Sequence, residues 1–354
     1  MRRKLQFGVF FIAPGRYSSS VAQTYREVLE EVAWAEELGF DSVWFAEHHF
    51  DPHFCLTPSP NLMAAAAATA TRRIHIGLAV NVLPLHHPLR LAEEGAMLDQ
   101  LSQGRLLWGI GRGISRKEFD PWQVPLGESA ERTHEAHDLI LQLWQQEEVH
   151  FEGQFWTVKG ARLTPRPYRA PHPPIWSVAT SPPSVRWAAE RGYPIMQVAR
   201  PVSAMAESWQ LYRSYYLETH GHPPEHEGLV PLRYLFVAES DAEARRLAEP
   251  HMSEFWQRFS RIDAPDRDDV KPERGYEFAF QNRRLRQSLG YDDLVREGIA
   301  LIGSPKSLVE TIAAHAEATE MRYLLCDFWR ASLSHEDRRQ VMRRFAEEVM
   351  PHFQ

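Results

Sequence analysis

The chain has 354 residues, of which 44% are hydrophobic and 25% charged, proportions that exclude a disordered or fibrous protein. The balance of 40 lysines and arginines against 47 aspartates and glutamates gives a net charge of −7, which excludes the basic composition typical of nucleic-acid binders. Two cysteines, Cys55 and Cys326, cannot build a disulfide framework, so we expect a reducing, cytoplasmic location.

Residues 1–13 begin with charged side chains and continue with an apolar run, the pattern of a signal peptide. The apolar run is short, however, and Pro14-Gly15-Arg16 follows it without a small-residue cleavage site. We therefore interpret the run as the first buried strand. No stretch reaches the roughly 18 apolar residues that a membrane span needs, so we expect no membrane contact.

In the first half of the chain, short apolar runs alternate with segments of helical periodicity, such as Val28, Val32, Ala35 and Leu38. We expect strands at 5–13, 40–46, 74–85 and 106–110, and helices at 24–38, 60–72, 88–101 and 130–145. Residues 149–160 interrupt this alternation, and Gly153 between two strand-like runs predicts a small hairpin insertion.

The alternation resumes in the second half. We expect strands at 175–179, 194–198, 232–238 and 322–326, and helices at 183–191, 204–216, 241–259, 307–318 and 335–349. Residues 261–290 are charged and show little periodicity, which predicts an irregular, mobile insertion.

The predicted strands are too continuously apolar to face water on one side, so they belong to a parallel sheet covered by helices. An open doubly wound sheet and a closed (β/α)8 barrel both satisfy this pattern. Eight strands, each followed by a helix, favour an α/β (β/α)8 TIM barrel, formed as a single domain over residues 1–354.

Active sites of such barrels lie at the carboxyl ends of the strands. Polar residues follow four predicted strands there: Glu47-His48-His49, His86-His87, Gly111-Arg112-Gly113 and Thr180-Ser181-Pro182-Pro183-Ser184. An isolated histidine pair is more often a hydrogen-bonded loop than a catalytic one, but four clusters on one rim favour a cofactor-dependent site.

The segment Ser181–Ser184 has a serine cap and prolines in the first helical turn. Free N–H groups at a helix start favour a phosphate, although a plain capped helix explains the same residues equally well. By contrast, His134-Glu135-Ala136-His137 lacks the spacing of a zinc-protease motif, and we interpret it as a solvated helix face.

Motifs spread over nearly the whole chain resemble the bacterial luciferase-like flavin monooxygenases, especially the luciferase α-subunit. The matching segments are Gly39–Trp44, Glu47–Phe50, Val82–Pro84 with His87-Pro88, Glu93, Leu98–Arg105, Gly109–Gly113, Trp187–Gly192, Gly303–Pro305 and Val349–Pro351. The resemblance implies a (β/α)8 barrel that uses reduced FMN as a co-substrate, supplied by a separate flavin reductase. Oxygen then adds to the flavin, and the resulting peroxide oxygenates a small or medium organic substrate such as an aldehyde or ketone.

By the same resemblance, His48 is the catalytic histidine. We expect no metal site. The residues that the resemblance assigns to the cofactor are Arg112, Arg132, Ser181 and Ser184 for the phosphate, and Ala79, Val80, Ala179 and Thr180 near the ring. A cis peptide is expected between Ala79 and Val80. Two departures argue against light emission, because Gly111 replaces the reactive cysteine of luciferase and Thr180 replaces a glutamate beside the flavin ring.

Three alternatives remain open from the sequence. The first is a hydride-transfer oxidoreductase that uses the deazaflavin F420 on the same fold. The second is a metal-dependent barrel hydrolase whose ligands would come from His48, His49, Asp51, His86 and His87. The third is a catalytically silent flavin-binding subunit. For assembly, the resemblance implies a homodimer, and the small residues 64–68 offer a face for a second chain.

Overall fold

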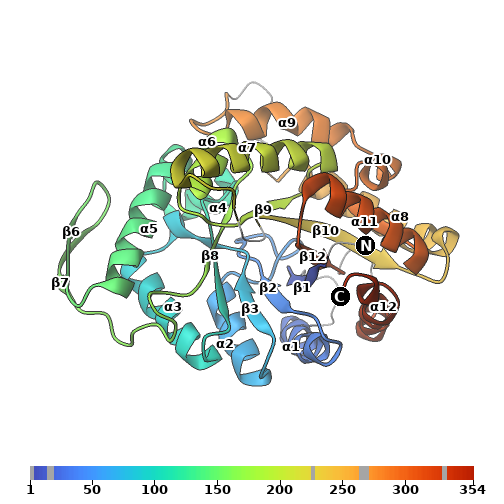
Figure 1. The fold of residues 1–354 in the computed structure, drawn as a ribbon, viewed down its shortest axis with the longest axis horizontal. Helices are drawn as coiled ribbons and strands as arrows, with labels where there is room; N and C mark the ends of the chain where they lie inside the picture. Colours follow the sequence, from blue (N-terminus) through green and yellow to red (C-terminus); the bar gives the residue numbers. More distant parts are fainter. Residues whose placement is uncertain (1–3, 14–19, 225–227, 263–270, 329–332) are drawn as a thin grey trace.

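The protein is described by a computed structural model over residues 4–13, 20–224, 228–262, 271–328 and 333–354. Within these ranges, eight parallel strands close into a ring (Figure 1). In ring order they are β1 (Gln6–Phe11), β2 (Ser42–Phe45), β3 (His75–Leu78), β5 (Leu106–Gly111), β8 (Ile175–Val178), β9 (Ile195–Val198), β10 (Leu229–Val237) and β12 (Tyr323–Asp327), which pairs again with β1. The predicted (β/α)8 barrel is confirmed.

Helices surround this ring, because a parallel pair of strands needs a crossover that returns the chain to the same end of the sheet. They are α1 (Val21–Glu37), α2 (Pro60–Ala70), α3 (Pro88–Ser102), α5 (Ser129–Gln145), α6 (Pro182–Glu190), α7 (Val202–His220), α8 (Asp241–Phe259), α11 (Pro305–Thr319) and α12 (His335–Glu348). No helix in the described ranges is both long and apolar enough to cross a bilayer.

Alternate strand residues point to opposite faces, which divides the core into two layers. One layer fills the space between strands and helices, and the other fills the inside of the ring. Inside, the rings of Trp44 and Trp176 lie 4.9 Å apart, and Tyr323 packs edge-on to Trp176 at 5.2 Å. These aromatic side chains make the barrel interior a packed core rather than a channel.

The predicted continuous strand over 74–85 is wrong. β3 ends at Leu78, a cis peptide bond joins Ala79 to Val80, and the short strand β4 (Asn81–Val82) leads into a 3₁₀ turn at Leu83–Leu85. Apolar content alone could not reveal this break, since both the strand and the turn are buried.

The prediction of an irregular segment over 261–290 is also wrong in its second half. Residues 263–270 lie outside the described ranges, but α9 (Glu277–Ser288) is a regular helix, followed by α10 (Tyr291–Arg296). A further strand that the sequence analysis missed, β11 (Ala300–Gly303), pairs with the end of β10.

The antiparallel hairpin β6 (Val149–Glu152) and β7 (Thr157–Ala161) stands outside the barrel, where Gly153 predicts it (Figure 1). The carboxylate of Glu135 on α5 holds its tip by accepting hydrogen bonds from the backbone N–H groups of three consecutive residues, Gln154, Phe155 and Trp156.

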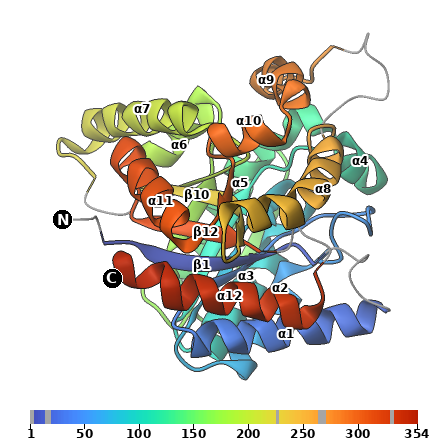
Figure 2. The same ribbon diagram turned by 90° about the vertical axis from the view of Figure 1, so that its right-hand side faces the viewer.

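The first and last helices lie side by side, which closes the outer layer of the barrel (Figure 2). Arg338 of α12 is only 1% exposed, and it donates hydrogen bonds of 2.8 Å to the carboxylates of Glu31 and Glu27 on α1. His335 adds a 2.9 Å contact between Nδ1 and Glu31 Oε1. A buried arginine with two carboxylate partners satisfies the requirement that buried charges be paired.

Candidate active site

His48 lies just after β2, at the carboxyl end of the barrel where the sequence analysis places it. Its Nδ1 lies 2.8 Å from Oε1 of Glu118, a carboxylate on the short helix α4 (Arg116–Phe119) that follows β5. The same oxygen accepts the backbone N–H of His49 at 3.0 Å. A carboxylate only accepts hydrogen bonds, so the pairing places a proton on Nδ1, and in the neutral imidazole Nε2 is the nitrogen with the lone pair.

The carboxylate of Glu47 organises the next layer beneath His48. Glu47 is 3% exposed, and it accepts hydrogen bonds from Nε2 of His49 at 2.9 Å, Nε2 of His86 at 2.7 Å and the N–H of Val82 at 2.9 Å. Burial pushes the pKa of Glu47 up, but the hydrogen bonds from the two histidines and Val82 outweigh it and lower the pKa.

His86 responds in the opposite direction. Burial would lower the pKa of His86, but its hydrogen bond to Glu47 and the attraction of that carboxylate raise the pKa. Glu47 therefore ties the ends of β2 and β4 together through one charged group. Since His49 and His86 both point at the same Glu47 oxygen, they serve as hydrogen-bond partners there, and no triad of metal-ligating side chains is found in the described ranges.

The cis peptide between Ala79 and Val80, which the resemblance implies, lies beside β5. The backbone there approaches so closely that β5 needs glycine: a Cβ on Gly109 would lie 1.7 Å from the carbonyl oxygen of Leu78, and one on Gly111 would lie 2.6 Å from a Val80 methyl group. Gly109 and Gly111 thus allow close packing between neighbouring strands at this rim.

Val178, the last residue of β8, is 36% exposed although its strand is otherwise buried. It shares its face of the strand with Trp176, which belongs to the barrel interior. Ala79 and Val80 are also partly exposed and pack against the same interior cluster. These residues give the mouth of the barrel an apolar floor that water reaches.

Ser181 and Ser184 lie together at the start of α6, as the sequence predicts. Their hydroxyl oxygens are 3.0 Å apart, and Ser184 Oγ accepts the backbone N–H groups of Thr180 and Ser181. The carbonyl of Thr180 accepts a hydrogen bond from Arg200, and the buried Ala179 carbonyl accepts one from Gln197.

The two candidate phosphate-binding arginines have different partners. Arg112 donates to the carbonyl of Gly275, and its guanidinium lies 4.2 Å from the centre of the Tyr276 ring. Arg132, in the first turn of α5, pairs with Glu128 at 2.8 Å and lies 4.3 Å from the centre of the Phe155 ring. Within the described residues, no contact joins either arginine to the other or to the two serines.

An aromatic wall adjoins His48. Its ring packs edge-on against Phe54 at 4.7 Å, and Phe54 in turn stacks on Phe255 at 6.4 Å and Phe259 at 6.3 Å. The last two residues lie near the end of α8, where Trp256 extends the wall by packing on Phe259 at 5.7 Å. The imidazole therefore has a carboxylate on one side and apolar rings on another.

The sequence analysis missed Glu118 and Tyr276 as members of this site. It placed Glu47 in the polar cluster after the second strand but gave this carboxylate no role of its own. Glu118 lies 70 positions from His48, and no local pattern connects them. Tyr276 lies in the segment predicted to be irregular, yet its hydroxyl donates to the Gly113 carbonyl and contacts Ser129.

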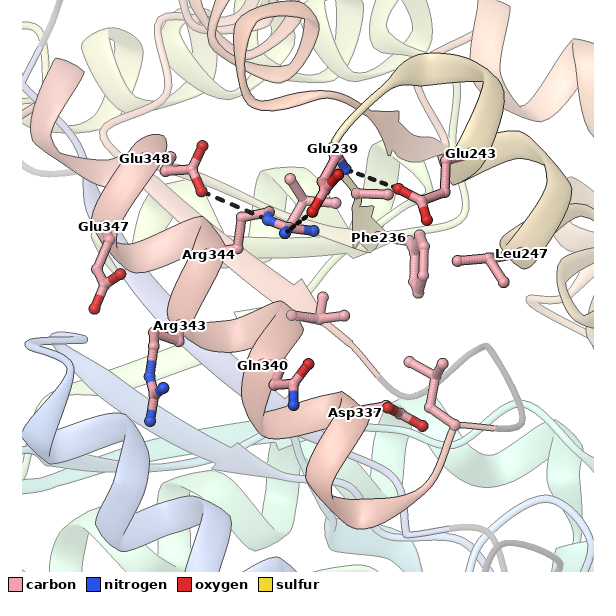
Figure 3. Close-up of a pocket in the computed structure, with 14 residues that line it drawn as sticks. Phe236, Glu239, Glu243, Leu247, Asp337, Gln340, Arg343, Arg344, Glu347 and Glu348 are labelled. Atoms are coloured by element: carbon pink, nitrogen blue, oxygen red, sulfur yellow. Dashed lines mark hydrogen bonds and ion pairs between the residues drawn. The ribbon is translucent and has the colours of Figure 1, made fainter.

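A separate hollow of about 590 Å³ lies outside the barrel, between α8 and α12 (Figure 3). Its floor is apolar, with Phe236 and Leu247, and its rim is charged. Arg344 at this rim is already paired with Glu239 at 3.3 Å and Glu348 at 3.5 Å. None of the predicted site residues lines this hollow, so it does not belong to the candidate active site.

A family model described as luciferase-like monooxygenase matches residues 5–321. The alkanal monooxygenase alpha chain of the Kryptophanaron alfredi symbiont is 28% identical over 90% of both chains. The oxygenase component of a flavin-dependent trigonelline monooxygenase from Acinetobacter baylyi is 27% identical over 94% of this chain and 90% of that one.

Among solved structures, the monooxygenase RslO1 from Streptomyces bottropensis superposes with a TM-score of 0.83 at 29% identity, covering 99% of this chain and 100% of that one. The oxygenating constituent of 3,6-diketocamphane monooxygenase from Pseudomonas putida, solved with FMN, has a TM-score of 0.80 at 24% identity over 98% of both chains, which shows a common fold. With the family match over most of its length, the chain belongs to the luciferase-like monooxygenases and is a flavin-dependent, oxygenating oxidoreductase.

Proposed function

We propose that this protein is the oxygenase component of a two-component monooxygenase, which uses reduced FMN and O₂ to oxygenate a small or medium organic substrate such as an aldehyde or ketone. The observation that carries the proposal is His48, oriented by Glu118 at the barrel mouth and packed against an aromatic wall. The trigonelline relative is named as an oxygenase component, which supports a separate flavin reductase as the partner.

The side chains at the mouth fit FMN chemically. Arg112 and Arg132 supply guanidinium groups, and Ser181 and Ser184 supply hydroxyls at the start of a nine-residue helix, a donor set suited to a phosphate dianion. The floor formed by Ala79, Val80 and Val178 suits an apolar ring system, with Ala179 and Thr180 beside it. Reduced FMN would supply the two electrons that activate O₂ for transfer of one oxygen atom.

In this scheme His48 moves a proton at Nε2. Its Nδ1–H is held by Glu118, so Nε2 is the atom that accepts a proton from the reacting groups and later returns it. The ring cannot rotate freely, because Phe54 packs against it and Glu118 fixes its other nitrogen. The surrounding aromatic side chains exclude water from this side of the imidazole.

The test is His48→Ala, assayed with a flavin reductase, O₂ and a panel of aldehydes and ketones. We expect FMN binding, followed by flavin fluorescence, to stay near wild type while product formation falls by about 10²-fold or more. The matched control is His53→Ala, an exposed histidine on the same loop. Wild-type turnover by His48→Ala would remove His48 from the mechanism.

Titration with FMN and with F420 separates the proposal from its main alternative. Tight binding of FMN with none of F420 supports the monooxygenase. The reverse result would assign the protein to hydride transfer, the chemistry of a deazaflavin-dependent enzyme.

We further propose that the protein works as a homodimer through α2 and α3. Of the small residues 64–68, Ala64, Ala67 and Ala68 are buried against this chain's own barrel, so they do not offer the face that the sequence suggests. The same two helices, which pack together, expose Leu62 (73%), Met97 (50%) and Leu101 (49%). Exposed apolar side chains on two adjacent helices support this placement of the interface, because a second chain would cover them.

A further inference from the structure

Helix α9 reaches across the carboxyl end of the barrel. Just before its start, Tyr276 donates to the carbonyl of Gly113, beyond the end of β5. Near its end, the carbonyl of Arg286 accepts a 2.9 Å hydrogen bond from the indole of Trp256 on α8. The helix therefore runs from the Arg112 side of the mouth to the aromatic wall, and Figure 2 shows it above α8 and beside α10.

Arg283, in the middle of α9, is buried without a counter-ion in the described part of the chain. It is 6% exposed, and its Nε and Nη1 have no hydrogen-bond partner. Its guanidinium lies 4.6 Å from the centre of the Phe280 ring on the same helix. An unpaired charge is costly to bury, so such a group is well suited to receive an anion.

Other arginines at this end of the barrel differ from Arg283 because they already have oxygen partners. They are Arg112 with the Gly275 carbonyl, Arg116 with Glu273, Arg200 with the Thr180 carbonyl and Arg274 with Glu131. Arg283 is thus the buried guanidinium on α9 whose Nε and Nη1 have no hydrogen-bond partner in the described residues.

We propose that Arg283 binds a carboxylate on the substrate, so that the substrate class is an aldehyde or ketone whose apolar skeleton also carries a carboxylate. This rests on the proposed function. Arg283 lies seven residues after Tyr276, which at a helical rise of 1.5 Å per residue is a distance of roughly 10 Å along α9. It is therefore well away from Arg112, where the FMN phosphate is proposed to bind. Toward α8, the wall from Trp256 to Phe54 leads to His48, which suits the apolar body of such a molecule.

The test compares carboxylates with neutral molecules of the same skeleton. Benzoate, indole-acetate and decanoate, each beside its methyl ester, are titrated into the wild-type protein by calorimetry, without reduced flavin or O₂. At least one acid is expected to bind about tenfold or more tighter than its ester, the range of a charge-assisted hydrogen bond. Arg283→Met should abolish this preference, and Arg283→Lys should retain part of it. The matched control is Arg284→Met, the exposed neighbour on α9.

Thermal unfolding provides a second readout that does not depend on activity. Without ligand, Arg283→Met should unfold at the same temperature as wild type or higher, because a buried unpaired charge has been removed. The acid that binds should raise the unfolding temperature of wild type and leave that of Arg283→Met unchanged. A large loss of stability in Arg283→Met without ligand would make Arg283 structural and overturn the proposal.

Two other outcomes would overturn it as well. Equal affinity for acids and esters, or binding of none of them, would show that no carboxylate is recognised. A lower affinity of Arg283→Met for FMN, with riboflavin binding unaffected, would assign the anion to the flavin phosphate. Because FMN binding and oxygenation are measured separately, failure of this proposal is distinguishable from failure of the monooxygenase assignment.

Discussion

Nδ1 of His48 and Oε1 of Glu118 lie 2.8 Å apart at the mouth of the barrel, although 70 positions separate the two residues. The contact joins the loop after β2 to α4, which follows β5. Glu118 does not need to touch a substrate to matter, because it fixes which imidazole nitrogen carries the proton.

Glu118→Gln should therefore lower kcat by about 10- to 100-fold while leaving FMN affinity unchanged. An amide can donate to Nδ1, which favours the tautomer with the proton on Nε2 and leaves His48 without a base at the site. The measurement is the pH profile of kcat together with KM. Glu118→Asp should recover part of the rate, and a variant with an unaltered profile would reduce Glu118 to a structural role.

Glu47→Gln should reduce stability in a pH-dependent manner. The raised pKa of His86 contributes stability that is present below the ordinary imidazole pKa and lost as pH rises through the raised value. The lowered pKa of Glu47 contributes stability that is present above the ordinary carboxyl pKa and lost as pH falls through the lowered value.

The difference in free energy of unfolding between wild type and Glu47→Gln should thus be about 1–3 kcal/mol. It should be largest at pH values between the carboxyl pKa of Glu47 and the imidazole pKa of His86. Urea unfolding across the pH range measures it, and NMR titration should show the pKa of His86 moving back down. Glu93→Gln, at an exposed carboxylate, is the control. A difference that does not change with pH would contradict the charge network.

Gly109→Ala should destabilise the protein by about 3 kcal/mol or more, because the new methyl group would meet the backbone carbonyl of Leu78, which cannot swing away. Gly127→Ala is the control, since its nearest neighbour is a side-chain oxygen of Glu273 at 3.4 Å. That variant should stay within about 0.5 kcal/mol of wild type in denaturant unfolding. Similar values for the two would contradict the close strand contact.

Charge introduced at the exposed face of α2 and α3 should dissociate the proposed dimer. Wild type is expected to sediment at about twice the chain mass of 40.9 kDa, and Leu62→Glu with Met97→Glu should sediment as the single chain. Leu217→Glu, at a 51% exposed leucine on α7, should leave the mass unchanged. If the wild-type protein sediments only as a single chain, the proposed homodimer is wrong.

The barrel was predictable because its signal is repeated: each strand is a short apolar run and each helix has its own periodicity. The site was partly predictable for a related reason. His48, Ser181 and Ser184 directly follow strands, and position along the chain places them on the rim. The end of strand β3 at Leu78 could not be predicted from hydrophobicity, because the residues before and after it are equally apolar.

The partners of the predicted residues could not be predicted. Glu118, Tyr276 and Arg283 reach the mouth from loops and helices whose paths depend on tertiary packing. In α9, eight charged or polar residues outnumber the four apolar ones that reveal helical periodicity, so the segment resembles a loop in sequence. Arg283 in particular is recognisable only once its burial is known.

The seam between α1 and α12 has a consequence for synthesis. Arg338 and Glu31 are 307 positions apart, and β1 meets its second neighbour, β12, only near the end of the chain. At ~5–20 residues per second, the ribosome takes roughly 15 to 60 s to cover that interval. During this time one edge of β1 has no strand to pair with. The nascent chain therefore needs protection from pairing with other unfolded chains until translation is almost finished.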